Sequence, residues 1–468
     1  MRFSELERAE VAVWGCGREG RAVLAALRRR YPRKSLTLYC KSDEVAALRD
    51  ASKPFPLGEG RGGDRVGSAR LRIRTDSPGA EALSAHDIVI KSPGISAYKP
   101  EILAAIERGT RFTSGTALWF GDNPGARVVA VTGTKGKSTT TALIAHVVRS
   151  LGVRTALAGN IGLPLLDLDG QRADLWAVEL SSFQTGEAGQ LELGVVVSLA
   201  EEHLDWHVTR ERYIADKLRL AGVSRTLLVD ASSPLLVERT AAHPSRAMFD
   251  DKGGWHVEEG FIRHAGERVF EVGALPLHGT HNAHNACAAL AAVGLLGFDA
   301  QRAASALRTF KPLPHRLTSL GERDGIEWID DSISTTPDAA LAALESLRSR
   351  RVTVILGGHD RGLDWRSFAR SLHAVPPHAV ITHGAAGPRI ARTMGDAKVG
   401  CVVAETSTLG AAVARAECLT ATNGVVLLSP GAPSFDQFKD YAERGRVFAR
   451  LAGFDDEAIG EITGLGIA

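Results

Sequence analysis

A strand-like run that ends in a glycine-bearing turn, VVAVTGTKGKSTTTALI (128–144), carries the clearest chemistry in the chain. The common phosphate-binding loop is G-x-x-x-x-G-K-S/T, in which backbone N–H groups hold phosphates, the lysine adds charge and the hydroxyl binds Mg²⁺. Gly136, Lys137 and Ser138 match its second half, whereas Val131 stands where its first glycine belongs. The segment predicts a variant ATP site, with Lys137 bridging the β- and γ-phosphates and Ser138 contacting the metal.

Acidic residues near this loop are candidates for holding Mg²⁺, which takes few protein oxygens and keeps several waters. Glu179 ends the strand-like run LWAVE, and side chains at strand ends in open α/β sheets reach the ligand crevice. The nearby string EEHLDWH (201–207) holds three acids and two histidines. Zinc is disfavoured there because no cysteine or further histidine lies at a convincing spacing, and a polar turn is the alternative.

A second glycine-rich turn, GCGREG (15–20), follows the run VAVW and fits G-x-G-x-x-G. A dinucleotide site would need an acid at the end of the next strand, about 20 residues on, to bind a ribose hydroxyl. Cys40 and Lys41 stand at that position instead. The sequence therefore disfavours a nicotinamide cofactor.

Strand-like and amphipathic helical runs alternate along nearly the whole chain, a pattern typical of parallel sheets covered by helices. Proline and glycine in GDNPGA (121–126) and two prolines in FKPLPHR (310–316) interrupt this pattern. We therefore expect an α/β protein of three domains: residues 1–121, 122–312 and 313–468. A polar stretch around 250–275 is expected to be less regular than its surroundings.

Composition excludes several classes of protein. The charged residues, 56 basic and 54 acidic, leave a net charge of +2, so no broad basic face for nucleic acid is expected. No apolar run approaches the roughly 18 residues needed to span a membrane. The charged N-terminus lacks a signal-peptide pattern, and five cysteines without a C-x-x-C pair suit reduced thiols. We expect a cytoplasmic location.

The pattern T-G-T-x-G-K-S-T and the strings ELSSFQ and LLSPGAPSFDQFKDYAERG occur here in an order that resembles the Mur ligase superfamily, ATP-dependent amide ligases that build the peptidoglycan peptide. The resemblance implies a Rossmann-like UDP-substrate domain, a central P-loop ATPase-like domain and a Rossmann-like C-terminal domain that binds glutamate. It also implies the cofactors ATP and Mg²⁺, and a part in cell-wall biogenesis, cell shape and cell division.

The same resemblance implies roles for individual residues. The catalytic residues would be Lys137, Glu179, His203 and Lys217, and the metal would be held by Ser138, Glu179, His203 and Lys217, the last as a carbamate. ATP would be bound by Gly133, Thr134, Lys135, Gly136, Lys137, Ser138, Thr139, Asn282, Asn285, Arg316 and Asp331.

The resemblance also implies which residues bind the two other substrates. The UDP-substrate would be bound by Gly15, Cys16, Gly17, Arg18, Ser92 and Asn160. Glutamate would be bound by Thr335, Arg361, Ser434, Phe435 and Tyr441. Arg361 stands where a lysine often pairs with the substrate carboxylate, and arginine makes a bidentate pair that lysine cannot make.

The resemblance implies that glutamate is added to UDP-N-acetylmuramoyl-L-alanine through an acyl phosphate. Most members of this branch add D-glutamate, but VWGCGREGRA together with DDSISTTP is similar to a smaller branch that adds L-glutamate, with an epimerase acting afterwards. We favour L-glutamate and a monomeric chain. The alternatives are D-glutamate, a folylpolyglutamate synthetase-like ligase, and a P-loop switch that binds nucleotide and a partner protein without ligating anything.

Overall fold

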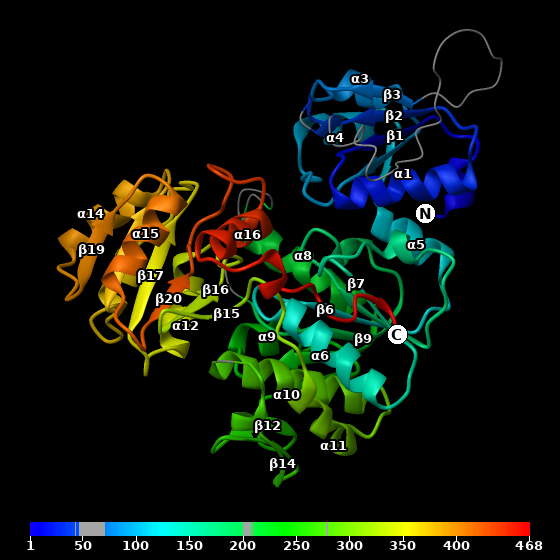
Figure 1. Ribbon diagram of the computed structural model, residues 1–468. Coiled ribbons are helices and arrows are strands. Elements are labelled where there is room, and N and C mark those ends of the chain that lie inside the picture. Colours follow the sequence, from blue (N-terminus) through cyan, green and yellow to red (C-terminus); the bar gives the residue numbers. More distant parts are fainter. Residues whose placement is uncertain (43, 46–70, 200–206, 208, 278) are drawn as a thin grey trace. The chain divides into compact units, whose positions relative to one another are not determined.

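The computed structural model describes residues 1–42, 44–45, 71–199, 207, 209–277 and 279–468. The chain divides into two compact units. The first unit comprises Met1–Ala274, His284–Leu307 and Gly464–Ala468, and the second comprises Leu275–Ala283 and Arg308–Thr463. The first unit contains two sheets and the second contains one (Figure 1).

The first sheet is wholly parallel and has the order β3-β2-β1-β4-β5. Val11 and Val13 pack in the core that contains helix α1, whereas Ala12 and Trp14 pack with α3 and α4 on the other face, as the two-residue period of a strand requires. The elements are β1 (Val11–Trp14), α1 (Arg18–Arg30), β2 (Leu36–Tyr39), β3 (Leu71–Arg74), α3 (Ala80–Ser84), β4 (Ile88–Lys91), α4 (Pro100–Glu107) and β5 (Arg111–Thr113).

The second sheet has ten strands in the order β14-β13-β12-β11-β10-β9-β6-β8-β7-β21. Its middle strands are buried along their whole length, which is why they are continuous apolar runs in the sequence. The strands are β6 (Val128–Thr132), β7 (Thr155–Gly159), β8 (Leu175–Glu179), β9 (Leu191–Val196), β10 (Ser224–Asp230), β11 (Arg246–Phe249), β12 (Trp255–Glu258), β13 (Phe261–His264), β14 (Glu267–Glu271) and β21 (Gly466–Ile467).

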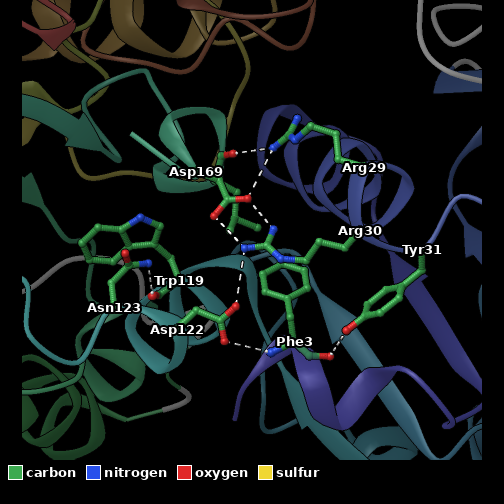
Figure 2. Close-up of polar contacts among 9 residues, drawn as sticks. Phe3, Arg29, Arg30, Tyr31, Trp119, Asp122, Asn123 and Asp169 are labelled. Atoms are coloured by element: carbon green, nitrogen blue, oxygen red, sulfur yellow. Dashed lines mark hydrogen bonds and ion pairs between the residues drawn. The ribbon is translucent and has the colours of Figure 1, made fainter. Parts of the chain in front are cut away.

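Helices cover this second sheet and connect it to the first (Figure 1). They are α5 (Gly115–Asp122), α6 (Lys137–Ser150), α8 (Arg210–Gly222), α9 (Pro234–Arg239), α10 (Thr280–Leu295) and α11 (Ala300–Ala303). At the junction of the two sheets, Arg30 at the end of α1 binds Asp169 and Asp122, and its guanidinium lies 3.9 Å from the ring centroid of Phe3 (Figure 2).

The expected irregular stretch around residues 250–275 instead forms the antiparallel strands β12, β13 and β14. The first connection has positive φ at Glu259 (51°) and Gly260 (79°), and the second at Ala265 (49°) and Gly266 (85°). Two consecutive positive φ angles are the geometry of the tight hairpin turn that suits twisted strands. Four- or five-residue strands are too short to show a clear alternation in the sequence, so the prediction was wrong here.

The third sheet forms the second unit, with the order β15-β16-β20-β17-β18-β19, and only β15 is antiparallel. Its two faces carry separate cores, with Val354 and Leu356 on one and Ile355 on the other. The elements are β15 (Thr318–Arg323), β16 (Ile326–Asp330), α12 (Pro337–Ser346), β17 (Val352–Gly357), α13 (Arg366–Ser371), β18 (Ala379–His383), α14 (Gly387–Asp396), β19 (Val402–Glu405), α15 (Leu409–Leu419), β20 (Val425–Leu428) and α16 (Tyr441–Leu451). The predicted α/β class is confirmed.

Candidate active site

The phosphate loop lies between β6 and α6, at the carboxyl edge of the second sheet. Gly136 precedes the helix with φ of 84°, in the left-handed region that glycine adopts without strain. A Cβ on Gly133 would lie 2.7 Å from Val197 Cγ2, and a Cβ on Gly136 would overlap the Asn285 side chain. Both glycines are therefore required by close packing from neighbouring elements as well as by the backbone.

Two neighbouring elements hold this loop in place. The Thr134 N–H donates to the Ser198 carbonyl (3.0 Å), the Lys135 N–H donates to Ser198 Oγ (2.8 Å), and the Thr134 hydroxyl bonds the hydroxyl of Tyr213 on α8 (2.8 Å). The Lys137 ammonium donates to the Thr134 carbonyl (2.8 Å). The predicted phosphate-binding lysine thus lies over its own loop.

Glu179 ends β8 directly beside β6, in register with Val131. Its side chain is 1% exposed; Oε1 accepts a hydrogen bond from Asn160 Nδ2 (2.9 Å), and Oε2 is buried without a hydrogen-bond partner among the described residues. A buried carboxylate oxygen left in this state calls for a cation or water, since buried polar groups are normally paired. Glu179 therefore fits a magnesium ligand at the phosphate loop.

The remaining predicted metal ligands are only partly described. His203 lies outside the described residues, and within those residues no cluster of three or more His, Cys, Asp or Glu side chains could hold a metal. Ser138 is half-buried at the start of α6.

Lys217 lies on α8 and is 2% exposed. Its ammonium donates to the Gly133 carbonyl (2.6 Å) and sits 4.9 Å from the ring centroid of Tyr213. The helix thus directs this lysine at the phosphate loop rather than at solvent. Carbamylation of Lys217 would place an anionic oxygen donor at the loop, and it stays a prediction.

The glycine turn after β1 packs closely on the segment after β4. Gly15 has φ of 98°, and a Cβ there would lie 2.8 Å from Ser92 Cβ. The Ser92 hydroxyl is buried and has no hydrogen-bond partner among the described residues. Burial raises the pKa of the Cys16 thiol to about 12, with a further contribution from Cys40, so Cys16 could meet a ligand only through its backbone. A Cβ on Gly17 would meet open space.

The segment after β7 brings this turn close to Glu179. Arg18 donates to the Gly162 carbonyl (3.1 Å), and two residues earlier the exposed Asn160 donates to Glu179. The predicted UDP-substrate residues and the predicted metal carboxylate therefore meet around one short loop of the first unit.

The other ATP-site candidates are distributed over both units. Thr139 is buried on α6, and Asn282 and Asn285 are buried on the first turns of α10, where Asn285 lies against Gly136. Arg316 lies between two residues with positive φ, and its Nε is buried without a hydrogen-bond partner among the described residues.

Asp331 is buried at the carboxyl end of β16 and is held by its own chain. It accepts hydrogen bonds from the Ser334 hydroxyl (2.5 Å), the Ser429 hydroxyl (2.7 Å) and the Leu317 N–H (3.3 Å). Burial raises the pKa of Asp331 to about 6. A ribose hydroxyl would have to displace one of these three donors or share an oxygen with it.

The glutamate-site candidates gather at the carboxyl edge of the third sheet. The loops after β17 and β20 meet there, because the His359 N–H donates to the Pro433 carbonyl (2.8 Å). Ser434 is buried, Phe435 is 69% exposed, and Tyr441 lies edge-on to the His315 ring (5.7 Å between centroids). Arg361 is exposed on the loop after β17, and Thr335 is half-buried after β16.

Four further residues support these sites and were not predicted from the sequence: Ser198, Tyr213, His207 and Asp216. Ser198 and Tyr213 hold the phosphate loop, and His207 binds Asp216, the neighbour of Lys217. The spacing of Tyr213 and Lys217, four residues apart on a helix, was the available signal, since such residues share a face. Nothing in the sequence marked Ser198.

No helix of the described chain has both the length and the hydropathy to cross a membrane.

Known protein families match most of the chain. The Mur ligase middle domain matches residues 131–293, and the Mur ligase, glutamate ligase domain matches residues 315–432. The UDP-N-acetylmuramoyl-L-alanine–L-glutamate ligase of Xanthomonas oryzae pv. oryzae (strain MAFF 311018) is 46% identical over 486 residues, and that of Xylella fastidiosa (strain Temecula1 / ATCC 700964) is 45% identical over 486 residues. Both alignments cover 100% of this chain and of the relative.

A solved structure shows the same fold. UDP-N-acetylmuramate–alanine ligase from Thermotoga maritima aligns with a TM-score of 0.62 at 19% identity, over 95% of this chain and 99% of that chain. The three sheets described above are therefore those of a known three-part α/β architecture.

Proposed function

The chain belongs to the Mur ligase family, and from this premise we propose that it joins L-glutamate to the alanyl carboxyl group of UDP-N-acetylmuramoyl-L-alanine. It is an ATP-dependent ligase of peptidoglycan synthesis. The choice of the L enantiomer is supported by the full-length identity to relatives described as L-glutamate ligases.

The observation that carries the proposed chemistry is the position of Glu179. Its buried Oε2, which has no hydrogen-bond partner in the described part of the chain, lies at the end of the strand next to the phosphate loop. Its other oxygen is bound to Asn160 of the segment that also contacts Arg18. Activation of a carboxylate by ATP needs the nucleotide, the metal and the carboxylate substrate at one place. This arrangement supports bringing the first two beside the UDP-substrate loop.

We propose an acyl-phosphate mechanism. An oxygen of the alanyl carboxylate bonds to the γ-phosphorus of ATP as the bond to the β-phosphate bridge breaks, giving an acyl phosphate and ADP. The neutral amine of glutamate then attacks the acyl carbon, and phosphate leaves as the amide forms and the amine loses a proton. Lys137 would neutralise charge on the transferred group, which is the main demand of phosphoryl transfer.

Magnesium would be held by Ser138, Glu179, His203 and carbamylated Lys217, and when bound it would neutralise phosphate charge. Gly133 to Thr139, Asn282, Asn285, Arg316 and Asp331 would bind ATP. Gly15 to Arg18, Ser92 and Asn160 would bind the UDP-substrate. Thr335, Arg361, Ser434, Phe435 and Tyr441 would bind glutamate. These assignments rest on motif matches, and the positions described above support them except at His203, which lies outside the described residues.

We also propose three domains, residues 1–121, 122–312 and 313–468, each centred on one of the three sheets. The last strand, β21, departs from this division because it pairs with β7 in the central sheet. The active chain would be a monomer in the cytosol, and an epimerase would act on its L-glutamyl product.

Phosphate release with each glutamate enantiomer tests the proposal. With UDP-N-acetylmuramoyl-L-alanine and ATP present, L-glutamate should release phosphate, and the product should have the mass of the UDP-linked L-Ala-Glu amide. D-glutamate should give at most a small fraction of that rate. Turnover with D-glutamate and none with L-glutamate would reverse the stereochemical assignment, and no turnover with either would remove the proposed function.

A further inference from the structure

Helix α8 presents two adjacent faces to two different parts of the first unit. Tyr213 and Lys217, four residues apart, contact the phosphate loop at Thr134 and Gly133. Arg212 and Asp216 are also four residues apart but are rotated by about 100° from the first pair. They contact Tyr98, so one rigid helix connects Tyr98 to the phosphate loop.

Tyr98 belongs to the connection between β4 and α4 that begins at Ser92. Its hydroxyl lies 2.9 Å from both carboxylate oxygens of Asp216, and its ring centroid lies 5.0 Å from the guanidinium of Arg212. At the other end of this connection, Ser92 packs against Gly15 of the glycine turn. The glycine turn therefore packs on a segment whose other end contacts α8.

Asp216 also fixes α8 against the segment that follows Glu179. His207 Nδ1 lies 2.7 Å from Asp216 Oδ2, and His207 Nε2 lies 2.9 Å from the Ser182 hydroxyl. The Thr185 hydroxyl donates to the backbone carbonyl of Asp216 (2.6 Å). Ser182, His207 and Asp216 are all at most 5% exposed, so these contacts lie inside the protein and hold the helix in one rotation.

Ser182, His207 and Asp216 are joined in the same order as the Ser-His-Asp triad of hydrolases. Here the serine is buried and the aspartate is shared with Tyr98 and with Arg219 (3.2 Å). An array closed in this way is suited to holding elements together and not to attacking a substrate.

We propose that Tyr98 and Asp216 are positioning residues that couple binding of the UDP-substrate to binding of ATP. Tyr98 connects the substrate segment to Asp216, and Asp216 sets the rotation of α8 that directs Lys217 and Tyr213 at the phosphate loop. This inference rests on the proposed function, because it needs the glycine turn to bind the UDP-substrate. Coupling of this kind is reciprocal and is typically 5- to 150-fold, so we expect about tenfold tighter ATP binding with the UDP-substrate present.

The test measures binding without turnover. The Kd of a non-hydrolysable ATP analogue with Mg²⁺ is measured by titration calorimetry, with and without saturating UDP-N-acetylmuramoyl-L-alanine. Tyr98→Phe removes only the hydroxyl and should reduce the coupling from about tenfold to less than about twofold. Asp216→Asn should do the same, and the double variant should lose no more than either single variant, since both changes break one link.

Tyr31→Phe is the matched control. It removes a tyrosine hydroxyl that donates to the Phe3 carbonyl (2.7 Å) at the end of α1 (Figure 2), and should keep the wild-type coupling. Should Tyr98→Phe or Asp216→Asn fail to fold, Arg212→Gln provides a second approach. Arg212 is exposed, and its replacement should lower the coupling in the same direction.

Wild-type coupling in a folded Tyr98→Phe protein would overturn the inference, as would the absence of coupling in the wild type. A wild-type protein that does not bind the UDP-substrate at all would instead overturn the proposed function. Turnover with L-glutamate together with unchanged coupling in Tyr98→Phe would refute the coupling and leave the proposed function standing.

Discussion

Asp216 and Lys217 are consecutive residues of α8, yet their side chains bind different parts of the chain. The Asp216 carboxylate accepts a hydrogen bond from Tyr98 (2.9 Å), and the Lys217 ammonium donates to the Gly133 carbonyl (2.6 Å). Because neighbouring residues on a helix are separated by about 100°, one rotation of α8 satisfies both contacts. Any change that turns this helix moves the lysine relative to the phosphate loop.

Glu179→Gln should lower the rate by about 100-fold or more and raise the Mg²⁺ concentration needed for half-maximal activity. The variant keeps the size of the side chain but removes the charge that would hold the metal, which is worth several kcal/mol in such sites. A Mg²⁺ titration of phosphate release measures both effects. Glu192→Gln, which changes a glutamate paired with Arg127 on the same sheet, should keep the wild-type Mg²⁺ requirement. Equal requirements in the two variants would contradict a metal-binding Glu179.

Lys217→Ala should lose activity by about 100-fold or more, and short carboxylates such as propionate should restore part of it. The reason is that a carboxylate can occupy the space of the missing side chain and supply the oxygen donor expected of a carbamate. Lys252→Ala, which removes an exposed lysine, should be fully active and insensitive to propionate. Failure of every short carboxylate to rescue a folded Lys217→Ala protein would count against the ligand role.

Glu19→Gln should raise the thermal stability at about pH 8 but not at about pH 4.5. Burial, with Asp167 and Glu187 nearby, raises the pKa of Glu19 from 4.5 to about 7. A raised carboxyl pKa means that the folded state binds the proton more tightly than the unfolded state does. The stabilisation that the protonated Glu19 gives the folded state is therefore fully present below pH 4.5 and is lost as the pH rises to about 7. The free energy of unfolding changes by about 3 kcal/mol over this range. Calorimetric Tm values across this range measure it.

The exposed Glu7→Gln variant is the control for this pH effect and should show no such trend. A Tm difference between Glu19→Gln and the wild type that stays constant from pH 4.5 to 8 would contradict the raised pKa of Glu19.

Arg30→Ala should lower the Tm of the first unit by about 2–4 °C. Figure 2 shows Arg30 between Asp169 and Asp122, and it also stacks on Phe3, so the variant loses a charge-assisted pair and a cation–π contact worth about 1–2 kcal/mol together. Calorimetry measures the shift. Arg366→Ala removes an exposed ion pair with Asp364 and should change the Tm by less than about 1 °C. Equal shifts would show that the Arg30 cluster contributes no more than a surface pair.

The parts of the fold that could be predicted are those set by residues that are neighbours in the sequence. Fully buried parallel strands such as β6 and β17 appear as continuous apolar runs. The strand, loop and helix around Lys137 follow from such a run and from the glycine-bearing motif after it. The strands β12 to β14 were not predicted, because their stability comes from pairing across tight turns and not from a periodic pattern. The pairing of β21 with β7 joins residues far apart in the sequence, which no local pattern can indicate.

The sequence by itself determined the types of chemical group: a phosphate loop, a strand-ending glutamate, a helical lysine and a glycine turn. Each is a short pattern whose residues are neighbours along the chain. The tertiary structure alone decided that Tyr98, Asp216, His207 and Ser182 meet, that Glu179 keeps one buried oxygen without a partner in the described chain, and that Arg18 reaches Gly162. Those relationships depend on the order of strands in a sheet and on the rotation of a helix. Long-range packing sets both.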